Sequence, residues 1–189
     1  MVTSLENHID ATLETIALTQ SIKFDSGQLF VTKYFNLLFG KISSLNTNAN
    51  IINKLFFKNN NTIKGIYLFG GVGRGKSMIM DLFFHNVDIK EKRRLHFHDF
   101  MKEVHQRVLE KSKVERNKDC VLLVAKDLAK SAKLLCFDEM EVRDIADAMI
   151  LSRLFEVMFE EGTILVTTSN ITSNNRDKII ASAISLTSI

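Results

Sequence analysis

The chain has 189 residues, of which 46% are apolar and 25% are charged, a composition typical of one globular domain with a hydrophobic core. A net charge of +3 is too small to indicate a nucleic-acid-binding protein or a protein held on membranes by charge, so no nucleic-acid partner is expected. No apolar stretch reaches the length of a transmembrane segment, and the two cysteines lack metal-ligand spacing. These features predict a cytoplasmic protein.

Residues 1–62 are predicted to form an N-terminal helical region. A first helix is expected after a capping box at Thr3, because apolar residues recur at helical intervals after it. A second helix is expected to begin at a cap formed by Asp25 and Gln28 and to end at Gly40. Its many apolar side chains need cover, either from the main domain or from a neighbouring subunit.

A glycine-rich segment between a short apolar run and an apolar helix pattern carries the strongest functional signal. The run 65–69 is typical of a buried parallel strand, and the nearly continuous apolar residues at 78–84 indicate a helix packed on a sheet. Between them, the pattern GxxxxGKS predicts a loop whose backbone N–H groups surround phosphate oxygens at a helix N-terminus. Lys76 is expected to reach the β- and γ-phosphates, and the Ser77 hydroxyl to bind Mg²⁺. The residues expected to bind the nucleotide are Gly70, Gly71, Val72, Gly73, Arg74, Gly75, Lys76 and Ser77.

A basic cluster at 90–94 precedes the next expected strand, which runs through His96 and His98 to a helix capped by Asp99. The cluster is interpreted as the solvated start of this strand, although contact with phosphate or a partner stays open. Two histidines two positions apart on a strand share one face. A metal pair is conceivable there, but hydrogen-bonded structural histidines are favoured.

A second chemical element follows a helix expected after Asp119. The apolar residues 134–137 indicate a buried strand that ends in Asp138 and Glu139. Ligands bind at the carboxyl ends of the strands in open α/β sheets, so both carboxylates are expected near the nucleotide. In P-loop chemistry Asp138 would help to hold Mg²⁺, and Glu139 would orient or deprotonate the attacking water.

The next expected elements are a long helix capped by Asp144 and stopped at Gly162, and a strand at 163–168. Asn170 lies just past this strand, where its amide could contact a γ-phosphate or the attacking water, or could simply form a turn. Residues 63–170 are therefore predicted to form the core domain, of class α/β, with a parallel sheet flanked by helices.

Five segments in this order resemble the ZapE family of AAA+ P-loop ATPases, which has bacterial cell-division members and mitochondrial members. They are GGVGRGKS at 70–77, RLHFHDFM at 94–101, LLCFDE at 134–139, DIADAMIL at 144–151 and TSN at 168–170. The resemblance implies ATP and Mg²⁺ as cofactors, Asp138 and Glu139 as the acidic pair, and Asn170 as the residue called sensor one. It also implies ATP hydrolysis that remodels a protein client in cell division or in a membrane complex. A homo-oligomer and peripheral contact with a membrane are left open.

Residues 171–189 form a divergent tail, since family members continue with further sheet, an arginine that acts on the neighbouring subunit's ATP, and a helical lid. The resemblance thus implies a sheet that is incomplete at the C-terminus, in which the outer edge of the strand before the phosphate loop is bare or covered by the tail. A bare edge would favour self-association. Arg176 is the only arginine of the tail, and its surroundings do not match the family's arginine segment. Slow hydrolysis is therefore expected, and the alternatives are a nucleotide-binding remnant or an ATP-gated binding module.

Overall fold

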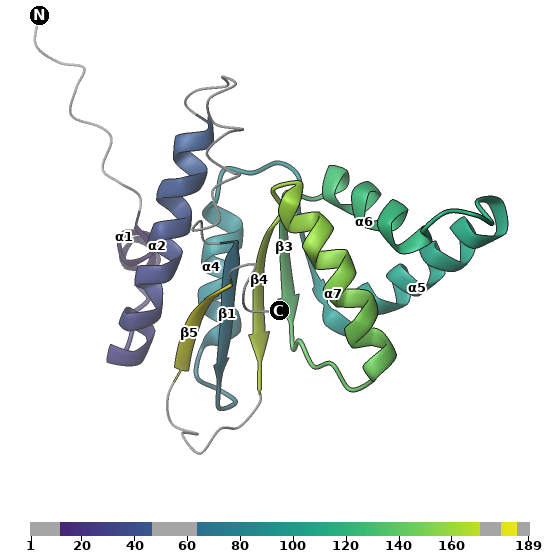
Figure 1. The fold of residues 1–189 in the computed structure, drawn as a ribbon. Coiled ribbons are helices and arrows are strands. Elements are labelled where there is room, and N and C mark those ends of the chain that lie inside the picture. The colour runs from purple at the N-terminus through teal and green to yellow at the C-terminus, as the bar shows by residue number, and fades with distance from the viewer. Residues whose placement is uncertain (1–11, 47–63, 171–178, 185–189) are drawn as a thin grey trace, which may run out of the picture.

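The computed structural model describes residues 12–46, 64–170 and 179–184. Helices and strands alternate along most of this part of the chain, as expected for class α/β (Figure 1). The elements are α1 Leu13–Thr19, α2 Ser26–Asn46, β1 Gly65–Gly70, α4 Lys76–Asn86, β2 Lys92–His96, α5 Phe97–Val114, α6 Cys120–Ser131, β3 Leu134–Asp138, α7 Ile145–Glu160, β4 Ile164–Ser169 and β5 Ile179–Ile184.

One sheet with the strand order β2-β3-β4-β1-β5 organises these elements (Figure 1). The four strands from β2 to β1 are parallel, so their carboxyl ends lie at the same end of the sheet. Gly65 lets β1 approach β4 closely, because a Cβ at this position would collide with the backbone of Leu165. The predicted fold class, a parallel sheet flanked by helices, is confirmed.

The fifth strand comes from the predicted divergent tail. β5 is antiparallel to β1 and pairs along all of it, from Gly65 opposite Ile184 to Gly70 opposite Ile179. The sequence left open whether the outer edge of β1 is bare or covered by the tail, and the structure shows that it is covered. α2 in turn packs against β5. The domain boundary predicted at residue 170, between the core domain and the tail, stays a prediction.

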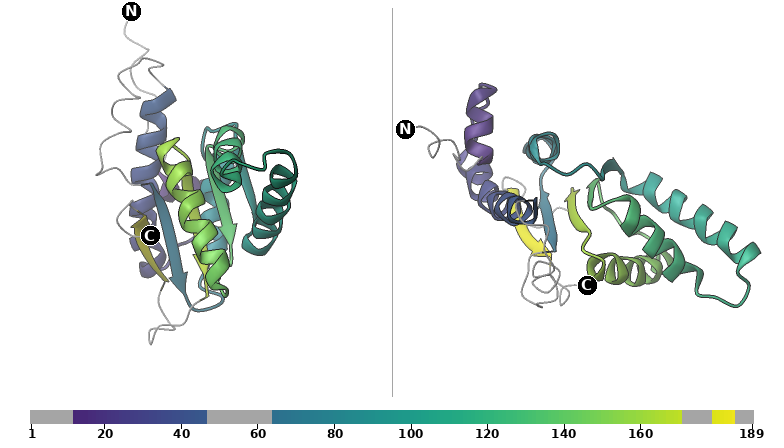
Figure 2. Two further views of the ribbon diagram at one scale, coloured as in Figure 1. Left: turned by 45° about the vertical axis from the view of Figure 1, so that its right-hand side comes forward. Right: turned by 90° about the horizontal axis from the view of Figure 1, so that it is seen from above.

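Different helices cover the two faces of the sheet (Figure 2). Alternate side chains of β3 show the division, as the pleat of a strand requires. Leu134 and Cys136 pack with α1, α2 and α4, and we call this side the α4 face. Leu135 and Phe137 pack with α5, α6 and α7, and we call this side the α7 face.

Three of the predicted helix caps are present. The Asp119 and Asp144 carboxylates each accept a backbone N–H from the first turn of α6 and α7. Asp25 and Gln28 form a reciprocal capping box at α2, with Asp25 N donating to Gln28 Oε1 at 3.0 Å and Gln28 N donating to Asp25 Oδ1 at 2.8 Å. The capping box predicted at Thr3 lies outside the described residues.

The prediction that α2 ends at Gly40 is wrong, because the helix continues to residue 46. Phe35 and Leu38 are fully buried on the α4 face, and Ile42 extends the same buried stripe. Burial of this stripe outweighs the ~1 kcal/mol that a glycine costs inside a helix.

The prediction that His96 and His98 share a strand is also wrong. β2 ends at His96, and α5 begins at the next residue, so His98 lies in the first turn of a helix. Phe97, Phe100 and Met101 are buried at helical spacing on the α7 face. Their burial as a helical stripe explains why the helix begins earlier than expected.

In the described part of the chain, no group of three or more His, Cys, Asp and Glu side chains could hold a metal ion. Among the helices described, none has both the length and the apolar character that crossing a bilayer demands. Cys120 and Cys136 are free thiols, and burial raises the pKa of Cys136, which makes it unreactive.

Candidate functional site

The predicted phosphate loop connects the end of β1 to the start of α4. Gly73 and Gly75 have φ values of 76° and 77°, in the left-handed region that glycine enters without a Cβ clash. Gly75 is the N-cap residue of α4 and supplies no side-chain bond to the first N–H groups of the helix. The loop therefore has the backbone of an anion-binding helix start.

The Lys76 side chain folds back over this loop. Its Nζ donates to Gly70 O at 2.9 Å and to Gly71 O at 2.7 Å, and the residue is only 6% exposed. Burial lowers the pKa of Lys76, while the negative charge of Glu139 acts in the opposite direction. The ammonium group thus lies at the loop and within electrostatic reach of the acidic strand end.

The amino-terminal end of α2 contacts the loop, which the sequence did not predict. Gln28 Nε2 donates to Arg74 O at 3.2 Å, and Asp25 Oδ2 pairs with Arg74 Nη2 at 3.2 Å. A Cβ at Gly75 would lie 2.5 Å from Gln28 Nε2, so the packing between loop and helix is close. The capping box of α2 therefore supports the phosphate loop as well as its own helix.

Asp138 ends β3, and Glu139 follows it at the carboxyl end of the sheet. The Glu139 backbone N–H donates to Thr168 Oγ1 at 3.1 Å, and the Met140 N–H donates to Thr168 O at 2.7 Å. Glu139 has a φ of 55°, which is uncommon for a residue with a side chain and is found preferentially at functional sites. These two bonds to β4 hold Glu139 in that conformation.

Asn170 directly follows β4, and its Nδ2 donates to Glu139 Oε1 at 3.3 Å. Because β4 lies between β3 and β1, its end falls between the acidic pair and the start of the phosphate loop. The structure thus brings the predicted residues Lys76, Glu139 and Asn170 to one end of the sheet.

Asp138 has a partner that the sequence did not predict. Arg94 on β2 donates from Nε to Asp138 Oδ2 at 2.9 Å and from Nη2 to Asp138 Oδ1 at 3.2 Å. The same guanidinium also pairs with Asp81 on α4. The interpretation of the basic cluster as solvated is therefore wrong for its last three residues, since Lys92 and Arg93 are also partly buried and hydrogen-bonded.

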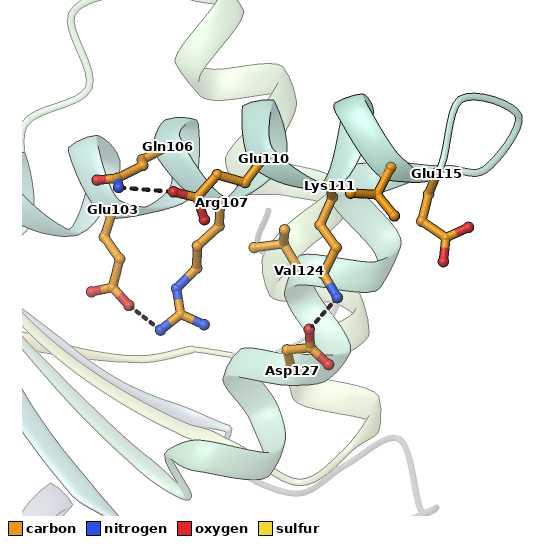
Figure 3. Close-up of a pocket in the computed structure, with 9 residues that line it drawn as sticks. Glu103, Gln106, Arg107, Glu110, Lys111, Glu115, Val124 and Asp127 are labelled. Atoms are coloured by element: carbon orange, nitrogen blue, oxygen red, sulfur yellow. Dashed lines mark hydrogen bonds and ion pairs between the residues drawn. The ribbon is translucent and has the colours of Figure 1, made fainter.

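A cavity of about 600 Å³ lies between α5 and α6, away from the phosphate loop (Figure 3). Its two basic side chains are both paired with carboxylates, Arg107 with Glu103 at 2.7 Å and Lys111 with Asp127 at 2.9 Å. The lining is completed by Gln106, Glu110, Val114, Glu115 and Val124. Because its cations are already neutralised, the cavity is a weaker candidate for a phosphate ligand than the loop.

Comparisons with known proteins show which family this chain resembles. The family model described as AFG1-like ATPase matches residues 31–178. Lactation elevated protein 1 homolog B of Danio rerio is 45% identical over 115 residues, which cover 57% of this chain and 23% of that protein. Cell division protein ZapE of Escherichia coli (strain K12) is 41% identical over 124 residues, which cover 64% of this chain and 32% of that protein.

The matched segments thus cover a third or less of these curated relatives. Among solved structures, the crystal structure of the DnaC helicase loader is similar with a TM-score of 0.49 and 14% identity, covering 89% of this chain and 81% of that chain. The family model matches well over half of the chain, and it agrees with the resemblance drawn from the five sequence segments. The chain therefore belongs to the AFG1-like ATPase family.

Proposed function

We propose that this chain binds Mg·ATP through residues 70–77 and hydrolyses it slowly. The observation that carries the proposal is the convergence at one end of the sheet of a glycine-rich helix start, a lysine folded over it, and the Glu139–Asn170 pair. A loop of this geometry stabilises phosphate through backbone N–H groups, and Lys76 adds a positive charge for the β- and γ-phosphates.

The donor set fits Mg²⁺, a hard cation that prefers oxygen ligands. Ser77 lies exposed in the first turn of α4, and Asp138 ends β3 at the same end of the sheet as the phosphate loop. We assign Ser77 and Asp138 to the metal. When bound, the ion would neutralise charge that develops on the phosphates.

Glu139 and Asn170 are assigned to the attacking water. The hydrogen bond from the Asn170 amide orients the Glu139 carboxylate, which can then accept a proton from water at the γ-phosphate. Asn170 can position the same water or a γ-phosphate oxygen.

The process that ATP hydrolysis would drive is inferred from the relatives. We propose that the protein remodels a protein client, because one relative carries the name cell division protein ZapE. A cytoplasmic location with peripheral contact to a membrane, and assembly into a homo-oligomer, belong to the same proposal.

A second function, nucleotide-dependent binding with little turnover, is favoured by β5. This strand occupies the edge of β1 that the resemblance to longer family members implies would otherwise pair with a later strand. A chain that closes its sheet in this way would work as a switch between an ATP-bound and an ATP-free state. Arg176, whose surroundings do not match the family's arginine segment, lies outside the described residues.

Nucleotide binding is tested with Lys76→Ala. Loss of charge-assisted hydrogen bonds worth roughly 1.5–3 kcal/mol should lower the affinity for a fluorescent ATP analogue about 10- to 150-fold. Lys102→Ala, at an exposed position on α5, is the matched control and should bind like the wild type. Equal affinity in the wild type and Lys76→Ala would remove the nucleotide from this loop.

Hydrolysis is tested with Glu139→Gln, which keeps the shape of the side chain and removes the base. The variant should bind the analogue normally and lose most of the wild-type phosphate release in a steady-state assay. A wild type without measurable release would select the switch function over the ATPase. Undiminished release by the variant would contradict the role of Glu139.

A further inference from the structure

We propose that Arg94 is a positioning residue that fixes the two predicted Mg²⁺ ligands, Asp138 and Ser77, relative to each other. The inference rests on the proposed Mg·ATP site and deepens it. In this scheme Arg94 contacts neither nucleotide nor metal, and it acts through the Asp138 carboxylate and through α4.

The contact with Asp138 restrains both the place and the rotation of the carboxylate. Two guanidinium nitrogens of Arg94 bind its two oxygens, at 2.9 Å and 3.2 Å. A planar fork paired with a planar carboxylate is the most orienting ion pair available to side chains. The Arg94 and Asp138 side chains are only 21% and 15% exposed, so water competes weakly for this pair. Each carboxylate oxygen keeps a second lone pair for the ion or for a water bound to it.

The contact with Asp81 ties the same guanidinium to the phosphate-loop helix. Asp81 stands four positions after Ser77 in α4, so both side chains lie on one face of this helix, one turn apart. Arg94 pairs with Asp81 while it holds Asp138. This bridge therefore orients the Ser77-bearing face of α4 toward the end of β3.

Position along β2 explains why Arg94 and not its neighbour takes this role. Successive strand residues point to opposite faces, and Arg94 stands opposite Cys136 of the α4 face while Arg93 stands opposite Leu135 of the α7 face. Arg93 makes an equally forked pair, with Glu103 on α5, at 3.1 Å and 2.6 Å. Arg93 is thus a matched control with the same chemistry on the far side of the sheet.

The experiment measures the affinity of the full chain for a fluorescent ATP analogue in EDTA, and then the Mg²⁺ concentration needed for half of the Mg²⁺-induced change in that affinity. Arg94→Gln should bind the analogue in EDTA like the wild type and should need roughly 10- to 100-fold more Mg²⁺, the range seen when a residue supporting a metal ligand is lost. Arg94→Lys keeps the charge without the fork, and the Mg²⁺ concentration that it needs should lie between those of the wild type and Arg94→Gln. Arg93→Gln should match the wild type in both measurements, although it loses an ion pair.

Asp81→Asn provides a second, independent arm. It leaves the Arg94–Asp138 fork intact and removes only the link to α4, so a smaller shift in Mg²⁺ dependence is expected, and it decides the case if Arg94→Gln does not fold. Wild-type Mg²⁺ dependence in folded Arg94→Gln, or a lower Mg²⁺ requirement, would overturn the inference while leaving the nucleotide site in place. Mg²⁺-independent binding by the wild type would overturn both the proposed metal site and this inference.

Discussion

The two faces of the sheet are built for different purposes, although both are well packed. On the α7 face, the core contains a cluster of aromatic rings that includes Phe100, Phe137 and Phe155, with ring centroids 4.6–6.4 Å apart. On the α4 face, the packed core continues into polar contacts that reach the candidate site, through Gln28 on α2 and Asp81 on α4. The α7 face therefore contributes mainly stability, whereas the α4 face couples stability to the geometry of the phosphate loop.

The largest expected effects come from one phenylalanine on each face. Phe100 and Phe83 are fully buried, and each change to alanine should lower the free energy of unfolding by about 3–5 kcal/mol. Phe83 packs α4 against Phe35 and Phe39 of α2, with centroids 5.0 Å apart in both pairs. At a temperature where both variants are folded, only Phe83→Ala should also lower the affinity for a fluorescent ATP analogue. Equal losses of binding would break the distinction between the faces.

A smaller effect is expected from Gln28→Ala, which removes the bond to Arg74 O and half of the α2 capping box. Each of these contacts is worth ~1 kcal/mol, so the affinity for the ATP analogue should fall about 5-fold and the midpoint of thermal unfolding should fall slightly. Gln106→Ala removes an exposed glutamine bond within α5 and serves as the control on the α7 face. Unchanged affinity in Gln28→Ala would show that α2 does not support the loop.

The smallest effect concerns pH and the ion pairs at the α7 face. Hydrogen bonding to Arg93 lowers the pKa of Glu103 below its ordinary value of 4.5, against the opposing effect of burial, so the ionised form stabilises the fold. This stabilisation is fully present above pH 4.5 and is lost as the pH falls through the lowered pKa. Because the pair is partly solvated, Glu103→Gln should cost at most about 1 kcal/mol at pH 7 and progressively less in acid. Denaturant unfolding between pH 7 and pH 3 measures this, with Glu156→Gln on α7 as the control.

A pH-independent difference between the wild type and Glu103→Gln would contradict this assignment. ATP-analogue affinity should not change in either variant at pH 7, because Glu103 lies on α5 and on the face away from the phosphate loop. A loss of affinity would show that the α7 face also reaches the site.

The phosphate loop and the acidic strand could be predicted because their signals are local. Glycines with positive φ stand one to six residues before Lys76, and Asp138 directly follows its own apolar run. The meeting of these two segments at one end of the sheet follows from the same logic, since parallel strands bring their carboxyl ends together.

The contacts that the sequence did not predict join residues far apart in the chain. Arg94 meets Asp138 across 44 positions, and Gln28 meets Arg74 across 46. The alternation of β2 was the available signal, because it places Lys92 and Arg94 on one face, but nothing in a single sequence shows what that face meets. Gln28 was assigned as a cap, and its second bond uses the amide nitrogen that the cap leaves free.

Helix bounds failed for a related reason. At Gly40 the local preference for a helix end is opposed by a stripe of buried apolar side chains that continues to Ile42. Packing of this stripe in the core outweighs the local preference, so the helix continues. At His98 the rings of Phe97 and Phe100 pack on the sheet at helical spacing, which the alternating histidines obscured.

The strand order has a consequence for intermolecular sheet growth. Within the described residues the two lateral edges of the sheet are β5 and β2, and β2 is only five residues long and begins with three consecutive cations. An edge strand this short, whose two arginines are already held in ion pairs with Glu103 and Asp138, is a poor template for β-augmentation. Growth of the sheet at the β2 edge is therefore expected to be unfavourable, and a peptide designed to add a strand there should not bind.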